Sequence, residues 1–257
     1  SAASDVYKRQ IMITIIFQKD VNMTFINKFI EQLEANNQIW LESILNQDIN
    51  LNQYLDSNGN NLLILSVYYK NYWFSKKIVN AGINITHTNN QGLCALELAI
   101  QLNCLRIIKL LLKEKNSIFF DRDGFNILHA VAANGNIKLI KMIMTLFDFD
   151  INIRDKNGFT PLLWAVQEKR CNAAEYLLLK GADINSIDSE GFDAIYISVS
   201  QGNKNMFYLL VSYGAKLTNL YDGENLLDIA IAWNHYDIAL YLVKKGIELR
   251  TDLKLPV

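Results

Sequence analysis

Residues 155–165 read DKNGFTPLLWA, and a helix-length segment separates them from GADIN at residues 181–185. Similar stretches follow one another along the chain, each around a glycine, at steps of 33, 32, 34, 33 and 32 residues. Those glycines are Gly59, Gly92, Gly124, Gly158, Gly191 and Gly223. A nearly constant step indicates that one structural unit has been copied, which builds a stack and not a pocket around one catalytic centre. The repeat therefore favours binding over catalysis.

Each repeat has the residues of a turn followed by two helices. Gly158 supplies the positive φ that a tight turn needs, at little steric cost. Thr160 followed by Pro161 is typical of an N-cap with proline in the first helical turn. A second helix is predicted over residues 173–179, and Gly181 is suited to end it. Since a repeat of this size cannot bury its own apolar face, neighbouring repeats must stack.

The pattern resembles the ankyrin repeat, which runs D-x-x-G-x-T-P-L-H-x-A and closes with G-A-D-V-N. The preceding repeat reads DRDGFNILHA at residues 121–130, and the following one begins with DSEGF at residues 188–192. The resemblance implies an all-α repeat solenoid: about seven helix-turn-helix repeats including caps, joined by β-turn or hairpin fingers. Only one repeat keeps the histidine, His129, for which we expect a structural hydrogen bond between neighbouring repeats. One repeat alone keeps Thr-Pro-Leu.

We expect five segments along the chain. Residues 5–10, DVYKRQ, can be back-translated into a transposon-end sequence used in library adapters, so residues 1–10 are interpreted as a sequencing-adapter artefact. The biological start is then Met12 or Met23. The remaining segments are a poorly ordered lead over 11–23, an N-terminal capping repeat over 24–55, the repeat array over 56–250 and a C-terminal tail over 251–257.

Composition narrows the function. The formal net charge is −1, which gives no global electrostatic case for nucleic-acid binding. The apolar run at residues 11–17 is too short to span a bilayer, so no membrane association is predicted. Three cysteines without paired spacing favour reduced structural thiols. The sequence offers no phosphate loop, nucleophile elbow or metal-ligand spacing, so we expect no enzyme activity, no cofactor and no metal.

The resemblance also implies where a partner binds. Ankyrin partners usually contact the turn tips and the exposed side of the first helix, which together line a concave face. Carried onto this sequence, the pattern gives Tyr68, Tyr69, Arg122, Asp123, Phe125, Lys156, Asn157, Phe159, Gln167, Glu168, Glu190, Phe192, Gln201 and Trp233. The three phenylalanines occupy equivalent positions, and two interpretations stay open for them: packing on the neighbouring turn, or contact with a partner.

We therefore predict a monomeric, non-enzymatic scaffold that binds an unidentified protein through this concave face. Two alternatives remain: the regulatory ankyrin portion of a larger enzyme or transporter, and a host-directed bacterial effector. The expected compartment is the cytoplasm, with secretion as the alternative if the chain is an effector.

Overall fold

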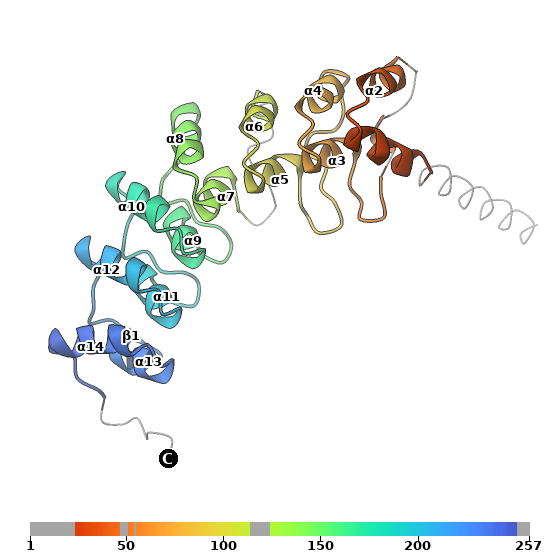
Figure 1. Ribbon diagram of the computed structural model, residues 1–257. Helices are drawn as coiled ribbons and strands as arrows, with labels where there is room; N and C mark the ends of the chain where they lie inside the picture. Colours follow the sequence, from red (N-terminus) through yellow and green to blue (C-terminus); the bar gives the residue numbers. More distant parts are fainter. Residues whose placement is uncertain (1–23, 47–50, 54, 114–123, 251–257) are drawn as a thin grey trace, which may run out of the picture. The chain divides into compact units, whose positions relative to one another are not determined.

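A computed structural model describes residues 24–46, 51–53, 55–113 and 124–250 (Figure 1). The chain divides into two compact units, residues 1–120 and 121–257. The expectations for residues 1–10, 11–23 and 251–257 lie outside the described residues.

A side-chain oxygen closes the turns that begin at Asp56, Asn89, Asp155 and Asp188. Asp155 Oδ1 accepts hydrogen bonds from the backbone N–H groups of Asn157 and Phe159, each at 2.9 Å. Gly158 donates its N–H to the Asp155 carbonyl at 2.9 Å and has a φ of 76°, which confirms the predicted left-handed glycine. A residue with a Cβ resists this conformation, which explains why glycine occupies the position.

The first helix of each repeat begins at a capping side chain. Thr160 accepts a hydrogen bond from Leu163 N at 3.3 Å and Pro161 follows it, as predicted. The other repeats place Asn, Asp or Cys at this position, and Cys94 Sγ accepts from Glu97 N at 3.5 Å. The capping role therefore survives the departures from threonine. These first helices are α3 (Leu62–Tyr68), α5 (Ala95–Gln101), α7 (Ile127–Asn134), α9 (Pro161–Gln167), α11 (Ala194–Ser200) and α13 (Leu226–Ala232).

A second helix returns alongside each first helix. The second helices are α4 (Tyr72–Asn80), α6 (Leu105–Leu111), α8 (Ile137–Leu146), α10 (Cys171–Leu179), α12 (Lys204–Ser212) and α14 (Tyr236–Lys244). A helix over 24–34, α2 (Gln38–Leu45) and the short 3-10 helix η1 (Leu51–Gln53) come before them. The described residues thus contain seven helix pairs, which confirms the predicted all-helical stack.

Short extended fingers join the repeats. β1 (Leu220–Tyr221) pairs antiparallel with β2 (Glu224–Asn225), with Tyr221 opposite Glu224. Isolated antiparallel bridges occupy the equivalent places in three other repeats, as between Ile187 and Asp193. None of the helices in the described ranges is long and apolar enough to cross a membrane.

Apolar side chains from neighbouring pairs form the core. In the second compact unit α9 packs on α7 and α11, and α10 packs on α8 and α12. In the first, α3 packs on α5 and α4 on α6. Leu162, Leu163, Val166 and Leu177 are each at most 1% exposed. Their transfer out of water is the main force that holds the stack together.

His129 joins the start of its helix to the finger that leads to the next repeat. It is fully buried, and its Nδ1 accepts from Asn126 N at 3.1 Å. Its Nε2 therefore carries the proton and donates to the Ile153 carbonyl at 3.1 Å. His129 thus makes a structural hydrogen bond, but the acceptor lies in the finger of its own repeat and not in the neighbouring repeat as expected.

Gly158→Val should destabilise the protein more than Gly191→Val. Both glycines have positive φ, so each valine costs about 1–2 kcal/mol in backbone strain. A Cβ at Gly158 would also lie 2.8 Å from Ser189 N, whereas one at Gly191 meets nothing within 4 Å. Urea unfolding would compare the two free energies, and equal losses would contradict the tip-to-tip contact at Gly158.

Candidate functional site

The tip-and-first-helix face comprises the turn tips and the solvent side of the first helices. Seven of the predicted partner-binding residues are exposed: Tyr68, Lys156, Asn157, Gln167, Glu168, Glu190 and Trp233. Five are half-buried: Tyr69, Phe125, Phe159, Phe192 and Gln201. Arg122 and Asp123 lie outside the described residues. The structure therefore leaves most of the predicted set accessible to a partner.

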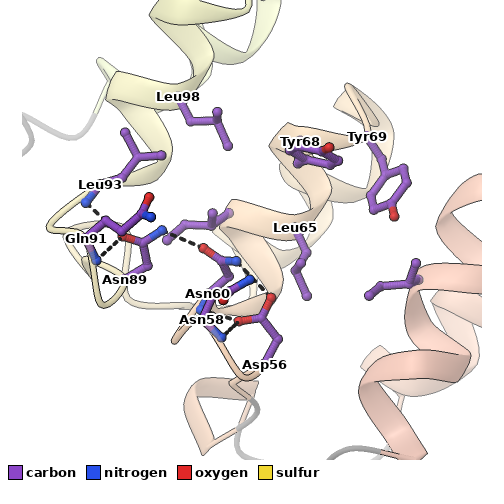
Figure 2. A pocket seen from close by; sticks show the side chains of 12 residues that line it. Asp56, Asn58, Asn60, Leu65, Tyr68, Tyr69, Asn89, Gln91, Leu93 and Leu98 are labelled. Carbon is purple, nitrogen blue, oxygen red and sulfur yellow. Dashed lines mark hydrogen bonds between the residues drawn. The ribbon is translucent and has the colours of Figure 1, made fainter.

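In the first compact unit this face contains a hollow of about 410 Å³ (Figure 2). Its position brings Tyr68 and Tyr69, at the end of α3, together with the tips of two turns. The lining residues are Ile30, Asp56, Asn58, Asn60, Ile64, Leu65, Tyr68, Tyr69, Asn89, Gln91, Leu93 and Leu98. Aliphatic and tyrosine side chains thus share the hollow with amides and one carboxylate.

Hydrogen bonds hold the polar side of the hollow in place. Asn60 donates its side-chain N–H to Asp56 Oδ2 and accepts from Asn89 Nδ2, both at 2.8 Å. The second of these bonds joins the tips of adjacent repeats, as Figure 2 shows. Asn89 takes the place of the turn aspartate and accepts from Gln91 N and Leu93 N. The tips are therefore preorganised before a ligand arrives.

The two tyrosines differ in their exposure. Tyr68 is 62% exposed, whereas Tyr69 is half-buried and its ring lies edge-on to Tyr68, with 5.3 Å between ring centroids. Desolvation raises the pKa of the Tyr69 hydroxyl, and the carboxylate of Glu34 raises this pKa further. At neutral pH Tyr69 therefore keeps its proton and can donate a hydrogen bond.

In the second compact unit aromatic rings line the equivalent face of its own repeats. Phe125 and Phe159 both contact Trp164, with centroid distances of 5.3 and 5.4 Å. Trp164 Nε1 donates to Asp155 Oδ2 at 2.9 Å, so the ring is tied to the turn. The phenylalanines thus pack on a neighbouring ring and stay half-buried, which leaves part of each ring accessible.

Sequence reasoning missed Trp164, although a signal was present. The buried residues Leu162, Ala165 and Val166 occupy the core side of α9. Residue 164 falls outside that stripe and is half-buried. The helical spacing therefore predicts that the Trp164 ring lies on the solvent side of α9.

Two tyrosines near Phe192 were also missed. Phe192 and Tyr196 stack with 4.0 Å between centroids, and Tyr221 lies 4.7 Å from Tyr196. Tyr221 is buried and donates its hydroxyl to Asp193 Oδ1 at 2.8 Å. Burial raises the pKa of Tyr221, and the Asp193 carboxylate raises it further.

Several side chains of types that can act in catalysis or bind metals have structural roles in this protein. His87 and His235 each hydrogen-bond a backbone carbonyl of a neighbouring repeat, at Gly59 and Ser200. Burial raises the pKa of the Cys94 thiol, which disfavours the nucleophilic thiolate. Within the ranges described, no group of three or more His, Cys, Asp or Glu side chains could hold a metal ion.

Comparison with known proteins identifies the repeat. The family model described as "Ankyrin repeats (3 copies)" matches residues 96–188 and 178–252. The human ASB11 ankyrin repeat domain superposes with a TM-score of 0.63 at 17% identity, covering 82% of this chain and 96% of that domain. An ankyrin repeat protein of Acanthamoeba polyphaga mimivirus is 27% identical over 202 residues, which are 75% of this chain.

Other relatives show that similar repeats occur in proteins of different kinds. "Probable 26S proteasome regulatory subunit p28" of Saccharomyces cerevisiae is 28% identical over 63% of this chain and 72% of its own length. Palmitoyltransferase AKR1 of the same yeast is 31% identical over 50% of this chain. The chain spans 26% of the mimivirus protein and 18% of the palmitoyltransferase.

Tyr221→Phe should reduce the loss of stability at alkaline pH. The folded-state pKa of Tyr221 lies above its ordinary value of 10.0. The Tyr221 hydroxyl therefore contributes fully to the free energy of unfolding below pH 10. This contribution falls as the pH rises above 10, by up to about 1.4 kcal/mol per pH unit. Urea unfolding at pH 8 and pH 11 would measure this. Equal losses in parent and variant would show that the hydroxyl does not contribute.

Proposed function

This chain belongs to the ankyrin repeat family, and from that premise we propose that it is a non-enzymatic scaffold that binds a protein partner through its tip-and-first-helix face. Ankyrin repeat domains are generally protein-binding modules, which supports the broad class. The choice of face rests on the side chains it presents.

The hollow beside Tyr68 and Tyr69 is the observation that carries the proposal. Its volume of about 410 Å³ falls within the roughly 300–1,000 Å³ range of ligand sites. Leu65, Leu93 and Leu98 offer apolar surface to a side chain of the partner. The partner is thus a protein segment that inserts an apolar side chain into the hollow.

The rim of the hollow suits a peptide backbone. The side chains of Asn58 and Gln91 lie at adjacent tips and can both donate and accept hydrogen bonds. A peptide that crosses the tips would therefore find partners for its own N–H and C=O groups, which must not be left unpaired on burial. Specificity would come from the apolar side chain and affinity partly from the backbone.

Exposed aromatic residues support the same face. Trp233 is 62% exposed and stands at the end of α13, as Tyr69 stands at the end of α3. Interface hot spots are enriched in Trp and Tyr, because these side chains bury a large area with few rotatable bonds.

A second candidate function is the ankyrin portion of a longer enzyme. The observation that favours it is the match to palmitoyltransferase AKR1, of which this chain spans 18%. In that case the face would recruit a substrate or a regulator, and the chemistry would lie in another part of the protein. An in-frame coding sequence adjoining this chain would support this candidate.

Tyr68→Ala should weaken the binding of peptides that are selected to bind this face. A displayed library of random peptides would be selected on the parent, and affinities would be measured by fluorescence anisotropy. Loss of an exposed tyrosine anchor is expected to cost about 1–3 kcal/mol. Tyr236→Ala is the matched control, since Tyr236 is 65% exposed but begins α14. Peptides that bind both variants as they bind the parent would exclude the hollow as the site.

Trp233→Ala should leave the fold intact and weaken partners that contact the second compact unit by about 1–3 kcal/mol. The indole is largely exposed, so its removal creates no core cavity. Circular dichroism and thermal unfolding would test the first part. A marked loss of helicity would show that Trp233 supports the core instead.

A further inference from the structure

A second part of the tip-and-first-helix face combines aromatic rings with negative charge. Phe192 and Tyr196 are both half-buried, and their rings stack with an interplanar angle of 6°. The buried Tyr221 ring lies beneath them, 4.7 Å from Tyr196 and 6.5 Å from Phe192. The hydrogen bond from Tyr221 to Asp193 holds the Tyr221 ring in place, so the stacked pair packs on a fixed side chain.

Four carboxylates lie near this pair. Glu224, Asp222, Asp188 and Glu190 all lie close enough to act electrostatically on the Tyr196 hydroxyl. The β1–β2 pairing sets Glu224 opposite Tyr221, whose ring lies 4.7 Å from that of Tyr196. Asp188 is buried and closes its turn by accepting from Glu190 N and Phe192 N. Glu190 and Asp222 are exposed and remain available to a partner.

Positive charge is missing from the same stretches of sequence. Residues 181–203 contain four acidic residues and neither Lys nor Arg. Residues 217–243 also contain four acidic residues and neither Lys nor Arg. Lys204 and Lys216 lie between these stretches, and Lys204 forms an ion pair with Asp237. On the preceding tip, Arg154 donates to the Ile187 carbonyl. The negative charge is thus local, in a chain whose net charge is only −1.

We propose that this acidic aromatic surface, formed by Phe192, Tyr196, Glu190, Asp222 and Glu224, binds a basic peptide segment of the protein partner and places an arginine against the Phe192–Tyr196 pair. A guanidinium stacks on aromatic faces and forms hydrogen bonds with carboxylates, so one side chain satisfies both halves of the surface. The carboxylates also speed the encounter by steering a cationic segment. A nucleic acid would be repelled. The inference rests on the proposed function, because it uses the same face.

The test uses the full chain and two labelled nine-residue peptides. One contains three arginines at alternate positions, and the other has citrulline at each of them, which removes the charge and preserves the shape. Anisotropy titrations should show that the arginine peptide binds at least about tenfold more tightly, and that added salt narrows the difference. Absence of binding by the arginine peptide, or equal binding by the two peptides, would overturn the inference.

A triple variant locates the site. Glu190→Gln, Asp222→Asn and Glu224→Gln together remove three charges, and asparagine tolerates the positive φ of residue 222. The control changes three exposed acidic residues outside this surface: Asp148→Asn, Glu175→Gln and Glu248→Gln. The first variant should lose about tenfold in affinity for the arginine peptide, and the control should lose much less. Equal losses would mean that binding follows net charge alone.

Two further measurements separate this inference from the proposed function. Phe192→Leu keeps an apolar side chain but removes the ring, so it should weaken the arginine peptide severalfold. Peptides selected on the hollow beside Tyr68 should bind the triple variant as they bind the parent. If they do, and the arginine peptide fails, the basic-segment inference falls and the scaffold function stands. Matched circular dichroism spectra would confirm that each variant is folded.

Discussion

One hydrogen-bonding arrangement supports four of the turn tips: an Asp or Asn side-chain oxygen that accepts two backbone N–H groups of its own turn. Asp56, Asn89, Asp155 and Asp188 all do this. The arrangement satisfies N–H groups that would otherwise lack a partner in a tight turn. It also fixes the direction of the residue that follows the turn glycine. The residue after the turn glycine therefore lies at the surface with a defined orientation.

The identity of that residue distinguishes the repeats. It is Asn60 or Leu93 in the first compact unit, where it lines a hollow. In the second it is Phe125, Phe159, Phe192 or Glu224, and each of the three rings packs on Trp164 or Tyr196. The same backbone thus presents an amide-edged hollow in one unit and a row of rings in the other.

Local rules were sufficient for the fold. The φ of Gly158, the Thr160 cap and the bond made by His129 each depend on residues within one repeat and the start of the next. The hollow and the ring clusters depend on pairs about one repeat apart, such as Asn60 with Asn89 and Phe125 with Trp164. A single repeat does not reveal these pairs, because they arise only when repeats stack. For the same reason Tyr221 went unnoticed, since it packs on Tyr196 of the preceding repeat, whereas exposed Tyr68 and Trp233 followed directly from the repeat pattern.

The restriction of contacts to neighbouring helix pairs has a kinetic consequence. α9 touches α7, α10 and α11, so closing its contacts requires loops of only about one repeat. Short loops lose little entropy on closure, and chains dominated by such contacts fold quickly. Structure can then nucleate in more than one pair and spread along the chain, pair by pair. A partner that bridges two tips would join pairs that otherwise open separately, and it would make their unfolding more cooperative.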